Sequence, residues 1–90
     1  MANVIMLKEA NMQELKDLVT YILKALVDNQ EKVDVKEIAG DKSIIFELRV
    51  GEGDLGKVIG KKGRTAQAVR TIISAAAMKM GKRTVLEILE

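Results

Sequence analysis

A short turn of two glycines and two lysines separates two helix-like segments in the second half of the chain. The turn and the residue after it read Gly60, Lys61, Lys62, Gly63 and Arg64. Glycine reaches backbone angles that other residues avoid, and it lets a second backbone come close. The lysines and the arginine make the turn cationic, which suits a sugar-phosphate chain. Because two glycines at this spacing are common, the surrounding sequence must decide whether the turn is a binding loop.

Length and composition predict one small globular domain without metal or redox chemistry. Ninety residues are enough for a single α+β domain with a modest core. Apolar residues make up 48% of the chain, which argues against disorder. The absence of cysteine excludes disulfides and thiolate metal sites, and the absence of histidine removes the commonest general base. The scattered carboxylates show no convincing pairing, so we expect neither an enzyme nor a cofactor nor a metal site.

The sequence predicts neither a membrane span nor a signal peptide. No apolar run approaches the roughly 20 residues that cross a bilayer. The short apolar run at residues 4–7 has no basic region before it and no small-residue cleavage site after it. We therefore expect a cytoplasmic protein.

Basic residues gather in the second half of the chain, although the net charge is only +2. Residues 57–70 contain no acidic residue and five basic ones, which are Lys57, Lys61, Lys62, Arg64 and Arg70. A polyanion would bind this half of the chain. A solvated helix face would also explain a cluster of this size.

Apolar spacing predicts a first helix after Asn11 that ends near residue 28. Its apolar residues recur at i, i+3, i+4, i+7, i+8, i+11 and i+12, and they are Leu15, Leu18, Val19, Ile22, Leu23, Leu26 and Val27. Asn11 and Glu14 have the spacing of a capping box. We expect residues 1–11 to be a tail or an added short element, and residues 12–90 to be the domain.

The middle and the end of the chain predict three strands and a second long helix. Residues 33–38 and 43–50 read as an antiparallel hairpin with Phe46 in the core. Residues 65–80 read as a helix whose buried stripe includes Ile72 and Ile73, and Gly81 is predicted to end it in the left-handed conformation. Residues 84–90 read as the third strand.

The glycine-rich residues 51–56 match G-x-G-x-x-G, and residues 51–58 come close to a Walker A sequence. We expect neither to bind a nucleotide. Glu52 and Asp54 place negative charge where a phosphate would lie, and Val58 stands where Walker A needs Ser or Thr. The preceding strand pair is also a hairpin, whereas a dinucleotide fold needs parallel βαβ units. The simpler interpretation is that Asp54 caps a short helix at residues 55–59.

The predicted order is helix, strand, strand, helix, glycine turn, helix, strand. This order resembles the type II, prokaryotic KH fold over residues 12–90. Within that fold the chain is similar to the KhpA family of small bacterial RNA-binding proteins. The supporting stretches are residues 42–50, 54–65 and 81–90. The resemblance implies an α-β-β-α-α-β domain whose three-stranded mixed sheet carries three helices on one face.

The resemblance also implies a site for single-stranded RNA. The residues that it implies are Gly60, Lys61, Lys62 and Gly63 at the phosphates, Val58 and Ile59 in an aliphatic groove, Arg64, Gln67 and Arg70 at the rim, and Arg83 on the opposite wall. KH domains clamp the backbone of about four nucleotides with a GXXG loop. An aliphatic groove fits a chain with only 2% aromatic residues.

The family resemblance implies protein partners as well, namely a second copy of the chain and a second KH-containing protein. Because one KH domain holds so few nucleotides, useful affinity would come from a second linked domain. Two functions therefore stay open. One is an RNA chaperone or post-transcriptional regulator, and the other is a dimerisation or interaction module for which RNA binding is secondary.

Overall fold

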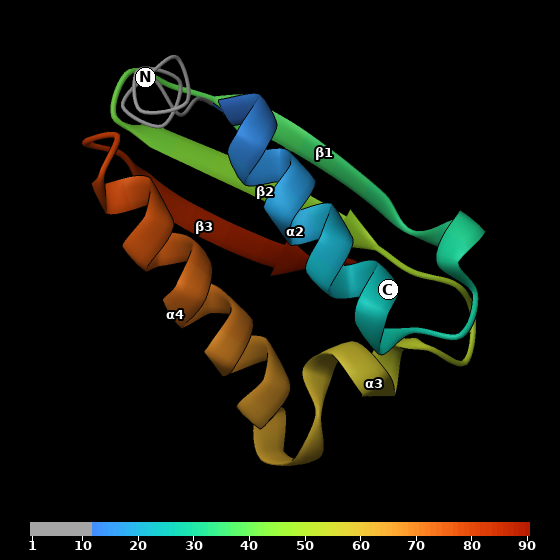
Figure 1. Ribbon diagram of the computed structural model, residues 1–90. Helices are drawn as coiled ribbons and strands as arrows, with labels where there is room; N and C mark the ends of the chain where they lie inside the picture. The colour runs from blue at the N-terminus through green and yellow to red at the C-terminus, as the bar shows by residue number, and fades with distance from the viewer. Residues whose placement is uncertain (1–11) are drawn as a thin grey trace, which may run out of the picture.

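The computed structural model describes residues 12–90 (Figure 1). Its elements are α2 (Met12–Leu26), η1 (Gln30–Lys32), β1 (Asp34–Ala39), β2 (Ser43–Arg49), α3 (Leu55–Ile59), η2 (Lys61–Gly63), α4 (Arg64–Met78) and β3 (Arg83–Ile88). The order of the main helices and strands is the predicted α-β-β-α-α-β. The predicted tail at residues 1–11, with its Asn11 cap, lies outside the described residues.

Residues 12–90 form a three-stranded mixed sheet in the order β1-β2-β3. β1 and β2 are antiparallel, and Val35 lies opposite Leu48. β2 and β3 are parallel, with Phe46 beside Leu86. A parallel neighbour needs a crossover connection, and α3 and α4 provide it between β2 and β3. This crossover carries the glycine turn to one end of the helical layer.

The two long helices, α2 and α4, lie side by side across one face of the sheet (Figure 1). The short α3 packs against both of them at one end of the layer. Between helices and sheet lies one apolar core, in which Val19, Leu23, Ile44, Phe46 and Ile73 are fully buried. None of the helices in residues 12–90 is long and apolar enough to cross a membrane.

Two side chains that the periodicity assigned to the core are exposed instead. Leu18 retains 36% of its accessible surface and Ile72 retains 52%. Each precedes a fully buried residue, Val19 or Ile73, and an α-helix turns by about 100° at each residue. Leu18 and Ile72 therefore lie on the flanks of their stripes, where the helical layer meets solvent.

Gly81 ends α4 in the left-handed conformation, as predicted. Its φ is 69°, and its N–H donates to the Met78 carbonyl at 3.0 Å. The Lys82 N–H donates to the Ala77 carbonyl at 3.1 Å. These two bonds form a Schellman motif, which turns the chain from α4 into β3.

Candidate nucleic-acid interface

The glycine turn is a tight loop that runs from the end of α3 to the start of α4. The Gly60 N–H donates to Gly56 O at 2.8 Å, and the Gly63 N–H donates to Gly60 O at 3.1 Å. Gly60, Lys62 and Gly63 all have positive φ, at 76°, 56° and 73°. Such angles disfavour residues with a Cβ. The two glycines are therefore backbone requirements of the loop.

The loop presents cationic side chains that no acidic group within the described residues neutralises. Lys61, Lys62 and Arg64 are exposed, and within residues 12–90 none of their side chains has a hydrogen bond or ion pair. Gly63 stands at the N-cap of α4 without a side-chain cap. Unpaired N–H groups at the start of a helix favour an anion. The loop and the first turn of α4 together favour a phosphate.

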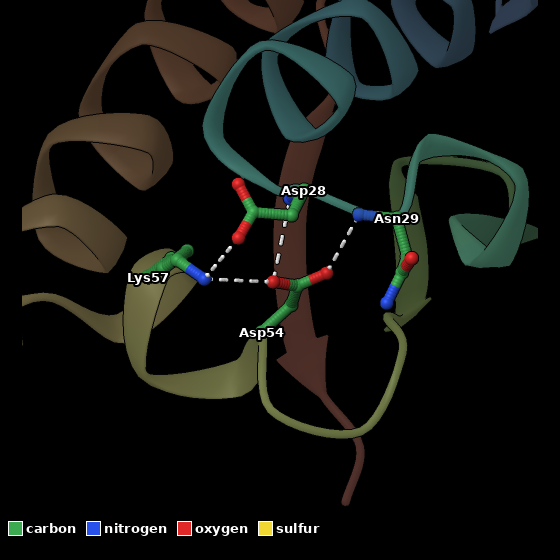
Figure 2. A network of polar contacts seen from close by, with 4 residues as sticks. All are labelled: Asp28, Asn29, Asp54 and Lys57. Carbon is green, nitrogen blue, oxygen red and sulfur yellow. Dashed lines mark hydrogen bonds and ion pairs between the residues drawn. The ribbon is translucent and has the colours of Figure 1, made fainter.

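Lys57 differs from these cations, because two carboxylates neutralise it (Figure 2). Its Nζ lies 2.8 Å from Asp28 Oδ2 and 3.1 Å from Asp54 Oδ1. The hydrogen bonds to Asp28 and then to Asp54 raise the pKa of Lys57 above its ordinary value. Lys57 therefore belongs to the 57–70 basic cluster in sequence, but its charge is used in ion pairs within the protein.

Asp54 does not cap α3, contrary to the sequence-based prediction. It makes no side-chain capping bond to that helix. Its carboxylate instead accepts the backbone N–H of Asn29 at 3.0 Å and that of Asp28 at 3.3 Å (Figure 2). The hydrogen bond from Asn29 is the main reason why the pKa of Asp54 is lowered, and the Lys57 ammonium adds to the effect. Asp54 thereby joins the end of α2 to the start of α3.

The same network explains why residues 51–56 are unsuited to a nucleotide phosphate. Asp54 is only 2% exposed, so this turn holds a carboxylate at its centre. From the sequence, a dinucleotide fold was excluded because the strand before these residues forms a hairpin. That reason was incomplete, since β2 pairs antiparallel with β1 on one side and parallel with β3 on the other. The buried charge of Asp54 is the stronger evidence against a phosphate.

A groove of about 570 Å³ runs between α4 and β3. It is lined by Gln67, Arg70, Thr71, Ser74, Ala75, Met78, Thr84, Val85 and Leu86. The Arg70 side chain spans the groove, and its Nη2 donates to the Leu86 carbonyl at 3.3 Å. Most of the lining is small or apolar, so the groove can accept a flat base.

The predicted site residues differ in their exposure and in whether they line the groove. Gln67 and Arg70 line the groove. Ile59 is 37% exposed at the end of α3, whereas Val58 is 1% exposed and belongs to the core. Direct contact with RNA is therefore not available to the Val58 side chain. Arg83 is exposed at the start of β3 but is not among the groove-lining residues.

Several groove residues were not identified from the sequence as part of a site. Thr71 and Ser74 were expected only to lie off the buried face of the helix. Thr84 had been placed on the opposite wall of the groove, as the family resemblance implies for residues 80–84. The spacing of Gln67, Thr71, Ser74 and Met78 by three or four residues would have indicated one continuous helix face. The family resemblance implied that the last strand forms the opposite wall of the groove, whereas no local pattern in the sequence indicated it.

Comparisons with known proteins agree on one family. The family model described as KhpA/KhpB, KH domain, matches residues 16–88. A protein of Aquifex aeolicus named RNA-binding protein KhpA is 58% identical over 79 residues, which cover 88% of this chain and 100% of that protein. A protein of the same name from Caldanaerobacter subterraneus is 58% identical over 73 residues, covering 81% of this chain and 97% of its own length.

The namesake from Clostridium perfringens is 53% identical over 75 residues, covering 83% of this chain and 100% of that protein. No solved structure shows a significant match to the chain. The matched family is not one of enzymes, in agreement with the expectation from composition. The family model and these relatives together place the chain in the KhpA/KhpB family of KH-domain proteins.

Proposed function

We propose that this protein binds single-stranded RNA, with the phosphates at the loop of residues 60–63 and the bases in the groove between α4 and β3. The observation that carries the proposal is a group of three cations where α4 begins, namely Lys61, Lys62 and Arg64, which have no ion pair within the part of the chain that the structure describes. Gln67 lies one helical turn after Arg64 and lines the groove. A strand of RNA held at the loop would therefore place its bases beside the groove. The names of the relatives, RNA-binding protein KhpA, support the same function.

The cellular role that fits this site is that of an RNA chaperone or post-transcriptional regulator in the cytoplasm. A GXXG loop clamps about four nucleotides, and the groove is short. Affinity would rise when two domains bind one RNA, since the second then binds at a high effective concentration. The proposal therefore includes a homodimer, and a second KH-containing protein as an alternative partner.

A protein-interaction role is the second candidate, and exposed apolar side chains favour it. Tyr21 on α2 is 74% exposed and Ile72 on α4 is 52% exposed. Ile38 and Val85 are 44% and 48% exposed on the sheet. In this alternative, RNA binding is secondary to assembly.

The decisive experiment is a titration of a labelled single-stranded RNA of about ten nucleotides at two salt concentrations, with the oligomeric mass followed in parallel. The test variant is Lys61→Asp with Lys62→Asp. Asp tolerates left-handed backbone angles better than most residues, so position 62 should keep its conformation. A matched control, Lys24→Asp with Lys42→Asp, makes the same charge change at exposed positions outside the loop.

The wild type and the control should bind in a salt-sensitive manner, and the loop variant should lose binding while it stays folded. Unchanged affinity in the folded loop variant would exclude the proposed site. If the wild type fails to bind any RNA, the interaction role becomes the better proposal.

A further inference from the structure

The outer edge of β3 supplies backbone groups to the groove. The N–H groups of Arg83 and Leu89 donate to β2 and the turn before it, at Lys42 O and Leu48 O. In a parallel pair of strands, every second residue directs both its N–H and its C=O towards the partner strand, and the residues between them direct these groups away from it. Thr84 and Leu86, which have the other parity, therefore direct their N–H and C=O groups outwards, into the groove that they line.

Arg70 already forms a hydrogen bond with one of these outward-facing backbone groups. Its Nη2 donates to Leu86 O across the groove. A guanidinium is planar and carries five N–H donors in a fixed fork. The hydrogen bond to Leu86 restrains the plane of the guanidinium. Its other N–H donors remain available to a ligand in the groove. Of the nine residues that line this groove, Arg70 is the one with a charged side chain.

The position of Arg70 makes a base its better partner than a phosphate. Arg70 lies six residues beyond Arg64, which is roughly 9 Å further along the helix axis. If the loop of residues 60–63 holds the phosphates, the nucleotide next to Arg70 reaches it with its base. A restrained fork with donors on one edge matches a base that presents two adjacent acceptors.

We propose that Arg70 is a specificity-determining residue, and that the groove prefers cytosine or guanine over adenine and uracil. Guanine offers O6 beside N7, and cytosine offers O2 beside N3. Adenine places an amino donor beside N7, and uracil places an N–H donor between its two carbonyls. Either mismatch would leave a donor of Arg70 facing another donor. The inference rests on the proposed function, because it assigns a base preference to that RNA site.

A bidentate contact of this kind discriminates by roughly 5- to 150-fold against the wrong base. The experiment compares ten-nucleotide RNAs of only A, only U, only C, and alternating G and A. They are titrated against the wild type and Arg70→Lys. Lysine keeps the positive charge but lacks the planar fork. Arg64→Lys is the matched control, since it makes the same change at the loop.

The wild type should bind the C and GA sequences at least about fivefold more tightly than the A and U sequences. Arg70→Lys should abolish that ratio while its affinity for the A and U sequences is retained. Arg64→Lys should leave the ratio intact. In NMR spectra of the wild type, the Leu86 amide should shift more with the C sequence than with the U sequence.

Equal binding of all four RNAs by the wild type would overturn the inference and leave the proposed function standing. A preference that survives in Arg70→Lys would also overturn it. If the wild type binds none of the four RNAs, the proposed function fails and the base preference fails with it.

Discussion

A Cβ atom on Gly60 would lie 2.1 Å from Oγ1 of Thr65, in the first turn of α4. The same atom would lie 2.6 Å from the Thr65 Cβ and 2.8 Å from its backbone nitrogen. A rotation of the Thr65 side chain could relieve the first contact but not the last. The space around Gly63 is open within 4 Å. Both glycines have positive φ, but only Gly60 is also enclosed.

We predict that Gly60→Ala is much more destabilising than Gly63→Ala. The Gly60 angles, φ 76° and ψ 171°, belong to a region used almost only by glycine, which costs about 1–3 kcal/mol for other residues. The clash with Thr65 adds to that cost, so a loss of at least about 3 kcal/mol is expected. Gly63→Ala should lose only about 1–2 kcal/mol. Urea denaturation of both variants measures the difference, and equal losses would contradict the prediction.

Much of the fold could be predicted because local periodicity specifies it. The apolar repeat of α2, the alternation around Phe46 and the glycine that ends α4 each depend on neighbours within a few residues. The element order then sufficed to suggest the KH fold. Side chains at the margins of a stripe, such as Leu18 and Ile72, were misplaced because their burial depends on how closely the adjacent elements pack.

The candidate site was predictable only in its loop. The lysines and glycines of residues 60–63 are adjacent in sequence. In contrast, Asp54 bonds to the backbone of Asn29, which is 25 positions away, and Arg70 bonds to Leu86, which is 16 positions away. Local patterns cannot identify such pairs, because the tertiary fold alone brings the two partners together. Asp54 was therefore assigned to the nearest helix start.

Removing the Asp54 carboxylate should lower the stability of the domain. Asp54→Ala removes the acceptor of the backbone N–H groups of Asp28 and Asn29. It also removes one of the two carboxylates that bind the Lys57 ammonium. Buried donors without partners are destabilising. Asp54→Asn keeps one carbonyl oxygen and should lie between Asp54→Ala and the wild type. The melting temperature of each variant provides the comparison.

Glu52→Ala is the matched control, since Glu52 is exposed in the same turn. A surface change of this type should stay within about 0.5 kcal/mol of the wild type. If Glu52→Ala and Asp54→Ala lower the melting temperature equally, the network around Asp54 does not stabilise the fold.

The same network should make stability depend on pH at both extremes. The pKa of Asp54 is lowered below its ordinary 3.8, chiefly by the Asn29 N–H. Its contribution is therefore fully present above about pH 3.8 and is lost as the pH falls through the lower folded-state value. The pKa of Lys57 is raised above 10.5, so its contribution is present below that pH and is lost as the pH rises through the folded-state value.

Urea midpoints at pH 7, pH 3 and pH 11 would measure this dependence. The wild type should lose more stability than Asp54→Asn between pH 7 and pH 3, because the variant has no carboxylate to protonate there. Between pH 7 and pH 11, the wild type should lose more than Lys57→Gln. Parallel curves for wild type and variants would exclude the assigned roles.

The lysines should differ in how much they contribute to the salt dependence of RNA binding. Lys57 is held by Asp28 and Asp54, so its replacement by Gln should leave the slope of log K against log salt nearly unchanged. Lys61 and Lys62 have no such partners in residues 12–90. Each single change to Gln there should reduce the slope by about 0.7, the value for one phosphate contact on a single strand. Titrations at four salt concentrations give the slopes. Urea midpoints measure stability, which only Lys57→Gln should lower. A large slope change for Lys57→Gln would mean that RNA displaces the carboxylates, and the separation between a structural lysine and two binding lysines would then be wrong.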